Sequence, residues 1–150
     1  GSSNIGLEST VVDLTQKETK IIRYGGINKQ ELNEIIPLNN SKKKIKKFIS
    51  PGLSKSHYQP DTSIRINASK PRKNEAWLAF GNIPKHHKGV AISLSKKKCL
   101  KESAKNLYKM LRYLDKTKCE KIAVQKIPKL GLGIAINDRL QRASFKNTNA

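Results

Sequence analysis

The sequence has few of the residues on which several function classes depend. Its two cysteines, Cys99 and Cys119, are too few for a disulfide framework and lack the spacing of metal ligands. Aromatic residues make up only 5% of the chain, and no run of about 18 apolar residues could cross a membrane. The first residues, Gly1–Asn4, have neither the basic nor the apolar region of a signal peptide. We therefore expect a cytoplasmic protein.

Acidic residues are also scarce. The chain has 11 Asp and Glu against 31 Lys and Arg, which gives a formal net charge of +20. A field of that size attracts nucleic acid and other polyanions. However, the excess is nearly all lysine, is spread along the chain and accompanies many Asn and Ile residues, as an A+T-rich genome would also produce. RNA binding and a compositional bias are therefore both open interpretations.

The N-terminal segment predicts a β-hairpin followed by a short helix. Thr10–Leu14 and Lys20–Tyr24 are rich in β-branched and apolar residues, as strands are. Asn28 and Glu31 have the spacing of a capping box, and the helix that they start would stop at Pro37. Two strands and a short helix bury too little apolar surface to fold alone, so we expect a fragment of a larger sheet domain.

The middle of the chain combines a charge run with an unusual loop. The lysine-rich residues 41–47 favour a solvated loop, with a phosphate-contacting patch as the alternative. Residues 50–60 mix proline and glycine with an adjacent His57 and Tyr58, which a passive spacer does not need. Tyr58 could stack on a nucleobase while His57 binds phosphate, or Tyr58 could simply pack against a neighbouring domain.

The C-terminal segment alternates predicted strands and helices. A long amphipathic helix is predicted at Cys99–Lys118, and a last helix is predicted to start near Asn137 and Asp138, which could cap it. This alternation indicates an α/β fold, a small Rossmann-like parallel sheet. The predicted strands are 76–80, 90–94 and 122–125.

Several candidate site residues also fit ordinary structural roles. Ser9 and Thr10 could offer hydroxyl groups to a carboxylate or phosphate, or could be ordinary strand residues. Arg23 suits phosphate, or could form a surface salt bridge. The adjacent His86 and His87 lack a third ligand for a metal. Gly131-Leu132-Gly133 lacks the third glycine of a dinucleotide motif, so it predicts a tight turn before the last helix.

Taken together, several motifs resemble the second half of a threonylcarbamoyl-AMP synthase of the long, two-domain type. The segments that carry the resemblance occur in the family's order and cover nearly the whole chain. They are Gly6–Asp13, Ile21–Ile27, Ser50–Leu53, His57–Pro60 and Gly131–Ala143. The resemblance implies that residues 1–49 end a YrdC-like catalytic domain, that 50–69 form a linker or lid, and that 70–150 form a Rossmann-like accessory domain.

The resemblance also implies a reaction. The family condenses threonine, bicarbonate and ATP, with magnesium, into threonylcarbamoyl-AMP and pyrophosphate, for modification of the adenosine beside the anticodon of tRNA. By the same resemblance Ser9 would contact threonine, Arg23 would contact the ATP phosphates, and Tyr58 with His57 would close over the nucleotide. No catalytic residue and no metal-binding residue is assigned in this chain.

The sequence departs from the family pattern in three respects. Tyr24 replaces the usual proline after the arginine, and Gln59 replaces alanine in the His-Tyr-Ala-Pro motif. The family's N-terminal segment, with the lysine and arginine that grip ATP and a Ser-x-Asn element, is absent from the sequence. We therefore expect no synthase activity from this chain alone. Two alternatives stay open: a subunit that completes a separately encoded N-terminal half, and a basic RNA-binding module.

Overall fold

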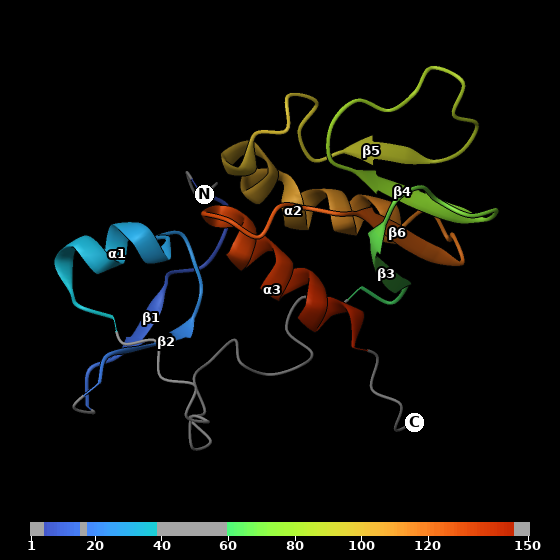
Figure 1. Ribbon diagram of the computed structural model, residues 1–150. Coiled ribbons are helices and arrows are strands. Elements are labelled where there is room, and N and C mark those ends of the chain that lie inside the picture. Colours follow the sequence, from blue (N-terminus) through green and yellow to red (C-terminus); the bar gives the residue numbers. More distant parts are fainter. Residues whose placement is uncertain (1–4, 16–17, 39–59, 146–150) are drawn as a thin grey trace.

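The computed structural model describes residues 5–15, 18–38 and 60–145. These residues form a small N-terminal part, with a two-stranded sheet and one helix, and a larger C-terminal part, with a four-stranded sheet and two helices. Figure 1 shows the two parts side by side, with the N-terminal end of α3 close to the smaller part. The arrangement confirms the predicted α/β fold with a hairpin and helix in front of a parallel sheet.

The predicted hairpin is present. Strands β1 (Val11–Asp13) and β2 (Lys20–Arg23) pair antiparallel, with a bulge between Val11 and Val12. The Asp13 carboxylate accepts hydrogen bonds from the backbone amide and the hydroxyl of Thr15 just after β1, at 2.9 and 2.7 Å. The antiparallel pairing places the start of β1 beside the end of β2.

Helix α1 (Lys29–Ile35) starts at the predicted capping box. The Asn28 side chain accepts hydrogen bonds from the backbone amides of Gln30 and Glu31, and the Glu31 side chain accepts one from the amide of Asn28. Of the helix residues, only Leu32 is buried, while the side chain of Ile35 is 77% exposed. The apolar face of α1 therefore lies mostly open among the described residues.

The larger sheet consists of parallel strands in the order β3-β6-β4-β5. Three of them, β4 (Glu75–Ala79), β5 (Ala91–Ser93) and β6 (Lys121–Gln125), lie where strands were predicted. The fourth, β3 (Ser63–Ala68), was not predicted and falls in the segment assigned to the linker. In β3 polar residues alternate with Ile64, Ile66 and Ala68. The alternation covers only six residues with prolines on either side, so the strand was not recognised in the sequence.

The two helices of the larger part differ in how well the sequence predicts them. Helix α2 (Leu100–Asp115) agrees with the prediction, but α3 (Leu132–Ser144) starts five residues before the expected cap at Asn137 and Asp138. Gly131, with φ 48°, precedes the first turn of α3. The Asn137 side chain instead donates hydrogen bonds to the carbonyl oxygens of Gly133 and Ile127, at 2.7 and 3.1 Å. The expected capping role was therefore wrong.

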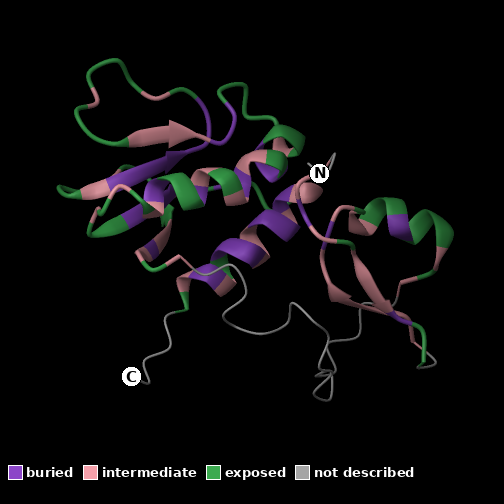
Figure 2. Cartoon of the chain, turned by 180° about the vertical axis from the view of Figure 1, so that it is seen from behind, coloured by how far each residue is buried: buried purple, intermediate pink, exposed green. Residues whose placement is uncertain are grey.

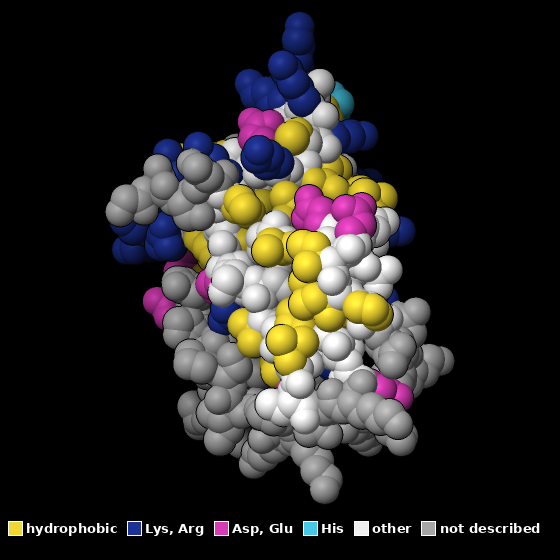
Figure 3. Space-filling model, turned by 90° about the vertical axis from the view of Figure 1, so that its left-hand side faces the viewer, with side chains coloured by type: hydrophobic (Ala, Val, Ile, Leu, Met, Phe, Trp, Pro, Cys, Tyr) yellow, Lys and Arg dark blue, Asp and Glu magenta, His cyan; other side chains and the backbone are white. Residues whose placement is uncertain are grey.

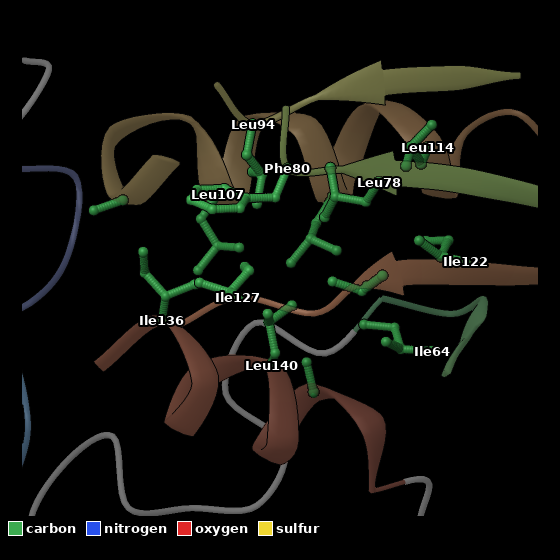
Figure 4. Close-up of a cluster of buried hydrophobic side chains, with 14 of the residues drawn as sticks. Ile64, Leu78, Phe80, Leu94, Leu107, Leu114, Ile122, Ile127, Ile136 and Leu140 are labelled. Carbon is green, nitrogen blue, oxygen red and sulfur yellow. The ribbon is translucent and has the colours of Figure 1, made fainter. Parts of the chain in front are cut away.

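The main hydrophobic core lies between the parallel sheet and the two helices. Both helices pack against strand residues of one side of the sheet, and Figure 4 shows strand side chains pointing toward Ile136 and Leu140 of α3. Leu7, from the N-terminal part, belongs to the same cluster. The two parts of the molecule therefore share one core. Its largest fully buried hydrophobic members include Leu78, Leu94, Leu107, Leu114, Ile122, Ile127 and Ile136.

Candidate functional site

Ser9 and Arg23, two of the predicted site residues, lie in contact. Ser9 precedes β1 and Arg23 ends β2, so the antiparallel pairing of these strands brings them together. The Arg23 guanidinium donates hydrogen bonds to the Ser9 carbonyl oxygen at 3.1 and 3.2 Å and to the Ser9 hydroxyl oxygen at 3.3 Å. Ser9 is exposed and Arg23 is half-buried. A hydroxyl group and a permanent cation thus meet at an accessible surface.

Thr10, the other candidate hydroxyl, is used within the loop that follows β2. Its Oγ1 accepts hydrogen bonds from the backbone amides of Gly25 and Ile27, at 3.1 and 3.2 Å, and donates one to the Ile27 carbonyl oxygen at 2.6 Å. A Cβ atom on Gly25 would lie only 2.3 Å from the Glu8 carbonyl oxygen. Thr10 and Gly25 therefore fix the loop beside Ser9, which makes Ser9 the better candidate for a ligand contact.

An ion pair between the buried Arg139 and the half-buried Glu8, which was not predicted from the sequence, holds this site against α3. The Arg139 Nε donates a hydrogen bond to Glu8 Oε2 at 2.8 Å, and a terminal nitrogen donates one to the Tyr24 carbonyl oxygen at 3.0 Å. The Tyr108 hydroxyl of α2 donates to the Glu8 carboxylate at 3.1 to 3.2 Å. Arg139 is only 7% exposed. Glu8 and Tyr24 directly adjoin Ser9 and Arg23.

The ionisation of this cluster follows from its surroundings. Burial raises the pKa of Glu8, but hydrogen bonds, foremost that from Arg139, and the charge of Arg139 outweigh burial and lower that pKa overall. The pKa of Tyr108 is raised, chiefly by burial and then by the Glu8 charge. Glu8 is therefore a carboxylate and Tyr108 a neutral hydroxyl donor at neutral pH.

One sequence signal could have revealed this ion pair. Arg139 lies three residues after Ile136 and four before Ala143, so a helical projection places it on the apolar face of α3. An arginine on a buried face needs an anionic partner, because an unpaired buried charge is costly. The pattern predicts such a partner but does not say that it lies 131 residues away.

The other candidate residues give a mixed outcome. His57 and Tyr58, and the lysine-rich residues 41–47, lie outside the described residues. The His87 ring packs edge-on against Trp77, with ring centroids 5.3 Å apart. Within residues 5–15, 18–38 and 60–145, no group of three or more His, Cys, Asp or Glu side chains could hold a metal ion. No helix of that same part is long and apolar enough to cross a membrane.

Two hollows lie away from Ser9 and Arg23. The larger, about 1250 Å³, runs along β5 and α2 and includes Lys85, Lys96 and Lys97 among its lining residues. The smaller, about 550 Å³, lies near the start of β4 and includes Arg72, Lys73 and Lys118. Figure 3 shows lysine and arginine side chains gathered toward the end of the molecule where the β4–β5 loop lies. Among the described residues, the lysines and arginines that line these hollows thus place positive charge on the larger part, away from the Ser9–Arg23 contact.

A protein-family model matches most of the chain. Residues 27–144 match the family model described as threonylcarbamoyl-AMP synthase, C-terminal domain. Two similar curated proteins are both named threonylcarbamoyl-AMP synthase. The one from Pyrococcus abyssi (strain GE5 / Orsay) is 30% identical and the one from Bacillus subtilis (strain 168) is 29% identical, each over 96% of this chain and 47% of the relative. The chain thus spans about half the length of these relatives.

Solved structures lead to the same family. A crystal structure of Sua5 from Pyrococcus abyssi complexed with L-threonine matches with a TM-score of 0.76 and 27% identity, over 95% of this chain and 47% of that one. A second structure, of a Pyrococcus abyssi Sua5 variant with alanine in place of an adjacent histidine and tyrosine, has a TM-score of 0.62 and 26% identity. That match covers 94% of this chain and 44% of the variant.

Proposed function

The chain belongs to the family of threonylcarbamoyl-AMP synthase C-terminal domains, and from this premise we propose that it forms the C-terminal part of an L-threonylcarbamoyladenylate synthase. The whole enzyme would be a cytoplasmic nucleotidyltransferase. It would join threonine, bicarbonate and ATP, with Mg²⁺ bound to the ATP, and its product would serve to modify tRNA. The observation that carries the proposal is the contact between the Arg23 guanidinium and Ser9 at the joined ends of β1 and β2.

The proposed reaction requires the positioning of anions more than covalent chemistry by the protein. The threonine amine and bicarbonate give a carbamate and water, and the carbamate carboxylate then attacks the α-phosphorus of ATP and displaces pyrophosphate. Placement of the two anions and neutralisation of their charge can supply most of the rate enhancement. A hydroxyl donor and a planar cation at one place suit this task, because both bind oxyanions.

Each site residue has a proposed role in this reaction. The Ser9 hydroxyl would bind threonine, in keeping with the L-threonine present in the Pyrococcus abyssi Sua5 structure. Arg23 would contact the ATP phosphates beside it. His57 and Tyr58 would close over the nucleotide, and they are the chain's one adjacent histidine-tyrosine pair, as in the two residues replaced together in the Sua5 variant.

The N-terminal part has the surface expected of a domain that another segment completes. Leu14, Ile27 and Ile35 are 63%, 49% and 77% exposed, although large aliphatic side chains are usually buried. Figure 3 shows apolar side chains on the face of the molecule where β1, β2 and α1 lie. An N-terminal half, either in the same polypeptide or separately encoded, would cover these side chains and supply the rest of the ATP site.

The test is pyrophosphate release that depends on threonine, bicarbonate and ATP. We expect no release from the 150-residue chain alone and release when an N-terminal half of a family synthase is added or fused. Ser9→Ala and Arg23→Gln should lower the activity of the completed enzyme at least about tenfold, since each removes a contact to a reacting anion. Full activity of the chain alone would contradict the proposal. A lack of activity after an N-terminal half is added or fused would contradict it as well.

A second candidate function is RNA binding by the larger part. It is favoured by the net charge of +20 and by the lysines that line the hollow along β5 and α2. Binding to tRNA would then weaken steeply with salt, and Lys96→Gln with Lys97→Gln would reduce the salt slope by about two. The absence of tRNA binding at low salt would reject this candidate and leave the synthase proposal untouched.

A further inference from the structure

A single side chain of α3 contacts both backbone segments that carry the proposed substrate contacts. Arg139 Nε donates to the side chain of Glu8, which precedes Ser9, and a terminal nitrogen donates to the carbonyl oxygen of Tyr24, which follows Arg23. The first contact measures 2.8 Å and the second 3.0 Å. The planar guanidinium therefore joins the two strand ends through a fixed fork of donors.

The orientation of Arg139 is itself fixed. Its remaining terminal nitrogen donates to Asp138 Oδ2 at 2.6 Å, and Asp138 also accepts hydrogen bonds from Arg142 at 3.0 and 3.1 Å. Tyr108 holds the Glu8 carboxylate from α2. Since Arg139 is buried and always charged, it has little freedom to leave this arrangement.

Within the described residues of the N-terminal part, Ser9 and Arg23 are held together by short strands and local hydrogen bonds. Strands β1 and β2 are only three and four residues long and include a bulge. The local ties include the hydrogen bonds from the Arg23 guanidinium to Ser9 at 3.1 to 3.3 Å, from the Gly26 amide to the Glu8 carbonyl oxygen at 3.0 Å and from the Gly25 amide to Thr10 Oγ1 at 3.1 Å. Two-stranded sheets are marginally stable without packing partners. The contact from Arg139 therefore adds a tie between these strand ends and the well-packed helix α3.

We propose that Arg139 is a positioning residue of the synthase, which sets the spacing between the threonine contact at Ser9 and the phosphate contact at Arg23 through Glu8 and Tyr24. This inference rests on the proposed function. It assigns the charged residues of the Gly131–Ala143 segment a role in catalysis that is distinct from folding. The accessory domain then acts on the reaction through this contact, without touching the substrates.

The first readout is catalytic, measured on the complete synthase that contains this chain. Arg139→Gln should lower kcat/KM for threonine about 10- to 100-fold, because a misplacement of about 1 Å between reacting groups costs rate on that scale. Arg139→Lys retains the charge opposite Glu8 but not the fork, so it should restore part of the loss. The matched control is Arg65→Gln, which breaks the Arg65–Glu75 ion pair within the parallel sheet and should leave kcat/KM within about twofold of wild type.

The second readout does not depend on activity. Hydrogen exchange of the Gly25 and Gly26 amides should become about tenfold faster in Arg139→Gln and stay unchanged in Arg65→Gln, because only the first variant frees the two strand ends. If Arg139→Gln does not fold, Glu8→Gln replaces it, since this change keeps the side-chain shape and removes the charge that Arg139 binds.

The outcomes separate the two proposals. A wild-type enzyme without synthase activity would reject the proposed function, while the exchange rates would still test the contact. Equal effects of Arg139→Gln and Arg65→Gln on kcat/KM would show that Arg139 only stabilises the fold, and that result overturns the inference. Unchanged exchange at Gly25 and Gly26 in the folded Arg139 variant would overturn it as well.

Discussion

The two parts of the molecule differ in where their stability comes from. The larger part, residues 60–145, has a continuous buried core between a parallel sheet and two helices, as the concentration of buried residues in Figure 2 shows. In residues 5–15 and 18–38 the buried hydrophobic side chains are Leu7 and Leu32, and Leu7 belongs to the core of the larger part. The residues with proposed substrate contacts thus lie in the part with little core of its own.

The smaller part keeps its shape through contacts with the larger part. Among the described residues, it docks through backbone and polar contacts, through the buried Leu7, and through the partly buried Ile5 and Tyr24, which pack against the shared core. Gly6, with φ 75°, lies so close to α2 that a Cβ atom there would be 2.3 Å from the Lys105 Cα atom. Glu8, two residues after Gly6, contacts Arg139 and Tyr108. The segment with the proposed substrate contacts therefore takes part of its geometry from the neighbouring part.

The largest expected effect separates the two parts by core packing. Leu78→Ala, in the middle of β4, should lower the free energy of unfolding by about 3 kcal/mol, because Leu78 is fully buried and the substitution leaves a cavity. Ile35→Ala in α1 removes a similar side chain that is 77% exposed and should change the free energy by less than about 0.5 kcal/mol. Urea unfolding of the chain, followed by fluorescence of its single tryptophan, Trp77, measures both.

Equal losses from these two substitutions would contradict the comparison. They would mean that α1 is packed as firmly as the sheet and that the smaller part has its own share of the core. A small loss in both would mean instead that the core around β4 can collapse around the cavity.

The sequence predicts the larger part well where apolar residues are periodic. Strands β4, β5 and β6 and helix α2 lie at or within a few residues of their expected positions, because runs such as 76–80 and the stripe along α2 leave few alternatives. Strand β3 was missed because only half of its residues are apolar and because Pro60 and Pro71 flank it. The start of α3 was missed because Gly131 directly precedes the helix and Gly133 is its second residue.

The candidate site was predictable only as far as local sequence reaches. The hairpin pattern implies that residues at the start of β1 and the end of β2 meet, so the contact between Ser9 and Arg23 follows from strand pairing. The contact of Glu8 with Arg139 depends on how α3 docks, which no local pattern specifies. The resemblance to a known family supplied the proposed ligands, which the residue types alone left open.

A smaller effect, with a characteristic pH dependence, is expected from an ion pair inside the larger part. Arg65 in β3 donates a hydrogen bond to Glu75 in β4 at 2.9 Å. Hydrogen bonds, foremost those from Arg65, outweigh the effect of burial and lower the pKa of Glu75 from 4.5 to about 2. The folded state then binds the Glu75 proton less readily than the unfolded state. The stabilisation is therefore fully present above about pH 4.5 and is lost as the pH falls toward 2.

Glu75→Gln measures this contribution. After an allowance for solvent screening of a pair at the sheet surface, the substitution should cost about 1 to 2 kcal/mol at pH 7. The difference in unfolding free energy between wild type and Glu75→Gln should shrink between pH 4.5 and 2.5. A difference that stays constant over that range would show that Glu75 titrates alike in the folded and unfolded states, contrary to the lowered pKa.

The smallest expected effect is confined to the smaller part. Asn28→Ala removes the side chain that caps α1 and should cost about 1 kcal/mol, but locally, because α1 buries only Leu32. The backbone amides of Gln30 and Glu31 donate hydrogen bonds to the Asn28 side chain. They should exchange about fivefold faster in this variant, while the amides of α2 keep their wild-type rates. Glu34→Ala, an exposed change in the same helix, is the control and should leave both sets unchanged. If Asn28→Ala also shifted the Trp77 unfolding transition, α1 would unfold together with the parallel sheet, and the two parts would form one cooperative unit instead of a firm core with a docked segment.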